Sequence, residues 1–75
     1  MVTYVATDER IVFTAQVEGF GPVEITSRRP GIFSGRLPDR KILAQAMKLV
    51  EDFVDQNKAE LSPIYARIAT TLSAA

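Results

Sequence analysis

The stretch that decides the fold is IVFTAQVEGFGPVEITSR, residues 11–28, because it holds two alternating strands and the turn between them. From Ile11 to Glu18, every second side chain is apolar, and this period of two is typical of a half-buried strand. Gly19 and Gly21 supply the positive φ angles that a tight hairpin requires. Val23 to Arg28 repeats the alternation, so we expect two paired strands with one apolar and one wet face.

A further strand is predicted before this hairpin. Residues Val2 to Thr7 are rich in β-branched and aromatic side chains, which favour strands. Asp8, Glu9 and Arg10 form a short polar link to the strand that follows. The sequence therefore predicts a three-stranded antiparallel meander whose apolar face must be covered by another element.

The tetrapeptide Arg29-Pro30-Gly31-Ile32 comes directly after the last predicted strand. Its proline and glycine occupy the two central positions that a type II turn favours. We interpret the turn as the end of the sheet and the beginning of a loop over residues 29–38, anchored by Ile32 and Phe33.

A long amphipathic helix is predicted after this loop. Pro38 and Asp39 mark its start, with Asp39 either capping the free N–H groups or lying in the first turn, where negative charge is favoured. At 100° per residue the apolar side chains fall within an arc of about 160°, wider than the roughly 100° needed to cover one surface. The members of this arc are Ile42, Leu43, Ala46, Met47, Leu49, Val50, Phe53, Val54 and Leu61. The helix therefore has apolar surface for a second contact.

Ser62 and Pro63 interrupt the helical pattern. Proline disfavours helical geometry at the residue before it, while serine at an N-cap followed by proline is a common helix start. The pattern leaves open whether Pro63 kinks one helix or separates two, and a short last helix is expected to carry Ile64, Tyr65, Ile68 and Leu72. We predict one α+β domain over residues 1–75, with strands over about 2–28, the loop over 29–38, and one long and one short helix over 39–73.

Size and composition limit how this domain can be stabilised. A chain of 8.3 kDa has an expected folded surface of about 4,600 Å² and buries only about 60% of its unfolded surface. The sequence has no cysteine and no histidine, so it has no disulfide and lacks the commonest metal ligands. Small domains without a disulfide or a structural metal often self-associate. The leading hypothesis is therefore a non-enzymatic interaction module that binds another protein or forms a homo-oligomer, with interface candidates Phe20, Ile42, Leu49 and Phe53.

Charge suggests an alternative function. The chain has no net charge, but residues 28–41 hold five basic side chains against Asp39 alone, a local charge of +4. Arginine side chains bind phosphate and carboxylate groups through two parallel hydrogen bonds. The alternative hypothesis is therefore an anion or nucleic-acid binder that uses this basic loop, although zero net charge weighs against nucleic acid. The candidate contacts are Arg28, Arg29, Arg36, Arg40 and Lys41.

Enzymatic function is not expected. Without histidine or cysteine the usual Ser-His, Cys-His and zinc-water arrangements are impossible, which leaves carboxylate or lysine catalysis open. No catalytic, cofactor-binding or metal-binding residue is predicted. Glu51, Asp52 and Asp55 share a helix face, but Lys48 and Lys58 lie three to four residues from them. We interpret these charges as weak surface ion pairs and not as a metal site.

Three segments give the chain a family resemblance. They are DERIVFTAQV (residues 8–17), VEITS (23–27) and LVEDFVDQNKAELSPIYARIA (49–69), which together resemble the small bacterial family named domain of unknown function 1488. The basic loop at 28–41 departs from that resemblance. The resemblance implies the same order of strands and helices but no activity, cofactor or site residue.

With no stretch of about 18 apolar residues and no basic, apolar leader pattern, the sequence predicts a cytoplasmic protein.

Overall fold

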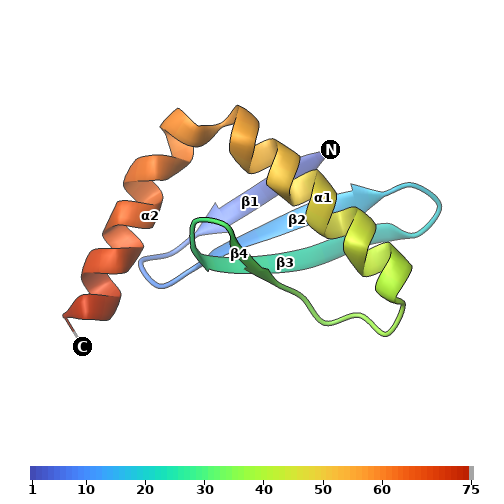
Figure 1. Cartoon of the computed structure of the whole chain (residues 1–75), viewed down its shortest axis with the longest axis horizontal. Helices are drawn as coiled ribbons and strands as arrows, with labels where there is room; N and C mark the ends of the chain where they lie inside the picture. Colours follow the sequence, from blue (N-terminus) through green and yellow to red (C-terminus); the bar gives the residue numbers. More distant parts are fainter. Residues whose placement is uncertain (75) are drawn as a thin grey trace.

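The computed structural model describes residues 1–74, which form one antiparallel sheet followed by two helices (Figure 1). The strands lie in chain order in the sheet, so the topology is a simple meander. The elements are β1 (Val2–Ala6), β2 (Ile11–Val17), β3 (Gly21–Arg29), β4 (Ile32–Ser34), α1 (Arg40–Gln56) and α2 (Lys58–Ser73). The predicted α+β class, with an antiparallel meander followed by helices, is confirmed.

The hairpin of β2 and β3 forms the centre of the sheet. Gly19 and Gly21 have φ angles of 80° and 119°, as the tight turn between the strands requires. The register places Phe13 opposite Ile25, and both side chains are fully buried on the face that the helices cover. The alternation in residues 11–28 therefore predicted correctly which side of each strand faces the core.

The chain does not leave the sheet after β3. Gly31 has a φ of 80°, as the third position of a type II turn requires, and Arg29 pairs with Ile32 across the turn. The turn therefore starts β4, a three-residue strand within the segment expected to be a loop. Phe33 explains this return, because its ring packs 6.3 Å from that of Phe13, whereas Ile32 is 59% exposed.

Helix α1 crosses the covered face of the sheet over β1, β2 and β3 (Figure 1). Its start is the predicted one, since Asp39 Oδ1 accepts hydrogen bonds from the backbone N–H groups of Lys41 and Ile42 at 3.0 and 3.2 Å. Ala46 and Val50, at the middle of the apolar arc, are fully buried. The remaining apolar side chains of the arc on α1 are half-buried around these two.

The boundary between the helices lies at Asn57 and not at Ser62. Asn57 has φ −125° and ψ 31°, outside the helical region, and its side-chain Nδ2 donates a hydrogen bond to the Phe53 carbonyl at 2.8 Å. Pro63 lies inside α2, so of the two alternatives left open at Ser62-Pro63, a new helix start is excluded. The two helices have 17 and 16 residues, and the expected long and short pair is therefore a pair of nearly equal length.

The turn at Asn57 sends α2 back across the sheet, where Leu61, Tyr65 and Ile68 are buried in the core. The Tyr65 hydroxyl lies 2.7 Å from Ser27 Oγ on β3, and Ser27 is 2% exposed. Ser27 Oγ also lies 2.8 Å from the Ile32 carbonyl oxygen. A carbonyl oxygen can only accept, so the Ser27 O–H donates to it and the Tyr65 O–H donates to Ser27.

The resulting molecule is open for its mass. Its accessible surface is 5,291 Å², against about 4,600 Å² for a typical monomer of this size. The Cα radius of gyration is 12.5 Å, against about 11.3 Å for a compact chain of this length. Neither helix in residues 1–74 is long and apolar enough to cross a membrane.

Candidate functional site: an arginine-lined groove

Only one face of the sheet is covered by helices. The side chains that alternate with the core positions of β3 point to the opposite face, among them Glu24, Thr26 and Arg28. None of these three is buried, and Glu24 and Arg28 are fully on the surface. The uncovered face is called the open face below.

A groove of about 860 Å³ lies on this open face, between β3 and the chain that follows β4. It begins at the end of the β2–β3 hairpin and follows β3 toward its last residues. Polar, charged and apolar side chains all contribute to its wall. The lining residues are Arg10, Pro22, Val23, Glu24, Thr26, Arg28, Ile32, Ser34, Gly35, Arg36 and Leu37.

Three arginines from separate parts of the sequence meet at this groove. Arg28 is on β3, Arg36 follows β4, and Arg10 immediately precedes β2. The pairing of Ile11 with Ser27 places Arg10 directly opposite Arg28, because the register continues by one residue. Glu24 is the one acidic side chain among the described residues that line the groove, so with three arginines the groove carries a net charge of +2.

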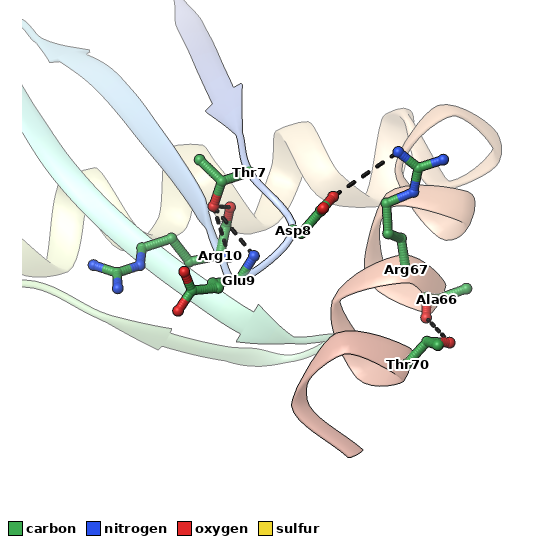
Figure 2. Close-up of polar contacts among 7 residues, drawn as sticks. All are labelled: Thr7, Asp8, Glu9, Arg10, Ala66, Arg67 and Thr70. Atoms are coloured by element: carbon green, nitrogen blue, oxygen red, sulfur yellow. Dashed lines mark hydrogen bonds and ion pairs between the residues drawn. The ribbon is translucent and has the colours of Figure 1, made fainter. Parts of the chain in front are cut away.

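The three guanidinium groups are not used by ion pairs within the described chain. Salt bridges in residues 1–74 join Lys48 to Asp52, Lys58 to Asp55 and Arg67 to Asp8. Figure 2 shows that the Arg10 side chain extends away from the Asp8–Arg67 pair, although it belongs to the same turn. The groove arginines are therefore free to contact a ligand.

The turn that carries Arg10 is held by its own hydrogen bonds. Thr7 Oγ1 accepts from the backbone N–H groups of Glu9 and Arg10, each at 3.2 Å, and the Thr7 N–H donates to the Arg10 carbonyl at 2.9 Å (Figure 2). The Asp8–Arg67 pair, at 3.9 Å, links this turn to α2. The backbone position of Arg10 relative to Arg28 is thus fixed by the turn as well as by the strand register.

The structure divides the five basic residues predicted to bind anions. Arg28 and Arg36 line the groove, but Arg29 does not. Arg40 and Lys41 lie in the first turn of α1 and also lie outside the groove. Arg10 was not among the candidates, because it lies eighteen residues before Arg28 and outside the basic loop in the sequence. The register of the β2–β3 hairpin, which follows from its glycine turn, was the signal that places Arg10 beside Arg28.

The four interface candidates have different surroundings. Phe20 is 49% exposed at the turn between β2 and β3. Phe53 is half-buried, and its ring lies 6.0 Å from that of Tyr4 and 6.1 Å from that of Phe13. Ile42 and Leu49 are also half-buried against the core. The α1 candidates therefore contribute to the core and keep part of their surface exposed.

The acidic face of α1 agrees with its interpretation as a set of surface ion pairs. Lys48 Nζ lies 3.5 Å from Asp52 Oδ1, and Lys58 Nζ lies 4.0 Å from Asp55 Oδ1. All four side chains are more than half exposed, so each pair contributes little to stability. Within residues 1–74, no group of three or more Asp, Glu, His or Cys side chains is arranged to hold a metal ion.

Comparisons with protein-family models, curated proteins and solved structures found no match to this chain. The resemblance to domain of unknown function 1488 therefore stays a prediction from the sequence.

Proposed function

We propose that this chain is a small non-enzymatic binding module that holds an acidic peptide segment in the arginine-lined groove. The observation that carries the proposal is the meeting of Arg10, Arg28 and Arg36 at one groove, with no ion pair to neutralise them within residues 1–74. Such groups bind carboxylates through paired, charge-assisted hydrogen bonds.

The rest of the lining favours a peptide over a nucleic acid. Thr26 and Ser34 supply hydroxyl groups and the exposed Ile32 supplies apolar surface, whereas Val23 and Leu37 border the groove but pack against the core. Among residues 1–74, no aromatic side chain lines the groove, so bases lack an aromatic surface on which to stack. A mixed wall with separated arginines suits an extended chain that carries both carboxylates and apolar side chains.

Binding of a labelled acidic peptide, with Glu and Val alternating, measured by fluorescence anisotropy, tests the proposal. We expect saturable binding at about 50 mM salt that weakens at about 200 mM salt. The Arg28→Gln/Arg36→Gln double variant should lose at least about tenfold in affinity, because each lost charge-assisted contact is worth about 1.5 kcal/mol or more.

The matched control is Arg40→Gln/Lys41→Gln, which removes the same charge outside the groove. We expect this control to keep its affinity within about threefold, since distant exposed charges are screened. Equal weakening by both double variants, or no binding of the wild type at low salt, would contradict the proposal. Tighter binding of a labelled single-stranded or duplex DNA than of the peptide would also contradict it.

Self-association and a cytoplasmic location, both expected from the sequence, stay predictions. The first has a specific structural basis at the opposite edge of the sheet from the groove.

A further inference from the structure

Strand β1 forms one edge of the sheet, and the directions of its backbone groups follow from two hydrogen bonds. The Gln16 N–H donates to the Met1 carbonyl, and the Thr7 N–H donates to the Arg10 carbonyl, each at 2.9 Å. In an antiparallel pair, residues that face the partner strand alternate with residues that face away. The backbone N–H and C=O groups of the odd-numbered residues of β1 therefore point toward β2. The N–H and C=O groups of Val2, Tyr4 and Ala6 point away from the sheet.

No hydrogen bond from elsewhere in residues 1–74 reaches these six outward groups. Natural proteins usually protect such an edge with charges, proline, bulges or a very short strand. The opposite edge, β4, has such protection, since it is three residues long, has a register shift and follows Pro30. Residues 1–7 contain no charged side chain and no proline.

We propose that β1 pairs antiparallel with β1 of a second copy of this chain, around a twofold axis at Tyr4. In this register Tyr4 lies opposite Tyr4 of the other copy, and Val2 lies opposite Ala6. With the symmetry-related pair of Ala6 and Val2 there are three such pairs. Each joins two residues whose backbone groups point outward, and each pair exchanges two hydrogen bonds. Every free group of both strands is then satisfied. A shift by two residues leaves some of the outward N–H and C=O groups without a partner. A shift by one residue moves the side chains of one strand to the opposite face of the sheet.

The side chains around this edge also favour a second copy. On the open face, Val5 is 70% exposed and would lie beside Thr3 of the other chain. On the covered face, the contact between Phe53 and Tyr4 shows which side of α1 is next to β1. Ile42 and Leu49 share that side with Phe53, because residues four and seven apart on a helix are neighbours. Phe53 is the member of this half-buried stripe that lies at the free edge, because α1 begins over β3 and crosses the sheet to β1.

The size of the molecule agrees with an uncovered surface of this kind. Its accessible surface of 5,291 Å² exceeds the roughly 4,600 Å² expected of a monomer of this mass. A five-residue strand pair alone is small beside the 1,200 Å² or so of a stable interface, and contact between the Phe53 ends of the two α1 helices would enlarge it. The twofold axis of the dimer is normal to the sheet, so the arginine-lined grooves of both copies would lie on the same face of the joined sheet. The dimer does not depend on what these grooves bind.

The Ala6→Pro variant tests the pairing with little effect on the fold. Ala6 is exposed, its N–H makes no hydrogen bond within residues 1–74, and the preceding Val5 is already extended, as a residue before proline prefers. Sedimentation equilibrium on the full chain should show the wild type at twice 8.3 kDa. Ala6→Pro should shift to the monomer mass and keep its circular dichroism, while the control Ala6→Val, which retains the N–H, should stay dimeric.

A cross-linking experiment tests the register independently, because the chain has no cysteine of its own. Thr3 and Val5 of opposite copies would form a non-hydrogen-bonded pair, whose short Cα separation of about 4.5 Å suits a disulfide. Mixed Thr3→Cys and Val5→Cys chains should form the mixed disulfide faster than either variant pairs with itself. A wild type that stays monomeric, an Ala6→Pro dimer, or no preference for the mixed disulfide would overturn the proposal.

Discussion

At the scale of single residues, Ser27 connects three parts of the fold. Its hydroxyl receives a hydrogen bond from Tyr65 on α2 and donates to the carbonyl of Ile32 on β4. Both side chains are nearly inaccessible, so neither hydroxyl has water as a substitute partner. This contact joins β3, β4 and α2 at one point, which explains why a polar residue occupies a core position of the central strand.

We predict that Ser27→Ala lowers the free energy of unfolding by about 1–3 kcal/mol, because it leaves the buried Tyr65 hydroxyl without its acceptor. Tyr65→Phe should lower it less, since the Ser27 hydroxyl keeps its carbonyl partner. Urea denaturation of both variants and of the double variant measures the coupling. If the two single effects simply add, the hydrogen bond between these residues contributes nothing to stability.

Gly35 shows why a residue without a side chain is needed where β4 ends. A Cβ atom at this position would lie 2.7 Å from Ile25 Cδ1 and 2.9 Å from Leu43 Cδ1. Both contacts are too short, although each neighbouring atom is the end of a flexible side chain. The close approach brings the segment between β4 and α1 down onto the core.

We predict that Gly35→Ala lowers the free energy of unfolding by about 1 kcal/mol or more, because the core must shift to admit the methyl group. Thermal unfolding followed by circular dichroism is a suitable measurement. Ser34→Ala, at the exposed neighbouring position, is the control and should change stability by less than about 0.5 kcal/mol. An unchanged Gly35→Ala melting curve would contradict the packing argument.

At the scale of elements, the two helices meet at one residue that ends the first and precedes the second. The Asn57 N–H donates to the Val54 carbonyl at 3.2 Å, and the Asn57 carbonyl accepts from the Leu61 N–H at 3.0 Å. The reversal lets α2 bury Leu61 and Tyr65 over the sheet instead of continuing into solvent. Burial of the second helix therefore decides where the first one ends.

Pro63 sits within α2, where it offers no N–H to the carbonyl four residues earlier, that of Ala59. We predict that Pro63→Ala raises the free energy of unfolding by about 1 kcal/mol, since the restored hydrogen bond outweighs the greater freedom of the unfolded chain. Urea denaturation measures the change. Ser62→Ala is the matched control, because that exposed neighbour already has its N–H. A lower stability of Pro63→Ala would contradict the prediction and show that the restored hydrogen bond does not outweigh the greater freedom of the unfolded chain.

At the scale of the whole molecule, two tyrosines connect stability to alkaline pH. The hydrogen bond to Glu60, followed by burial, raises the pKa of Tyr4 above its usual value of 10.0. Burial raises the pKa of Tyr65 as well, although its hydrogen bond with Ser27 opposes part of that increase. Both residues therefore favour the folded state in their protonated form.

We predict full stability below about pH 10 and a loss as the pH rises through the folded-state pKa values, because the unfolded chain releases these protons first. Urea midpoints between about pH 8 and pH 11, with tyrosinate absorbance recorded in parallel, measure the effect. The Tyr65→Phe variant should show a smaller decline over the same range. A midpoint independent of pH in the wild type would contradict the link.

Local patterns in the sequence predicted much of this fold. The period of two in residues 11–28, the glycine turn at 19–21 and the capping Asp39 each depend on neighbours within a few residues, and each was found as expected. Prediction of the site was partial. Arg28 and Arg36 were candidates, whereas Arg10 is eighteen residues from Arg28 in the sequence and becomes its neighbour only through strand pairing.

The sequence by itself determined the hairpin, its apolar face and the helix that covers it, because strand alternation and helical periodicity are written in adjacent side chains. Only the tertiary structure decided that the segment after Pro30 returns as β4, that the helices divide at Asn57, and that three arginines share one groove. Each of these depends on contacts between distant residues, such as Phe33 with Phe13 and Tyr65 with Ser27. The free energy of burying those side chains, which no local pattern records, selects among the turns and breaks that the sequence permits.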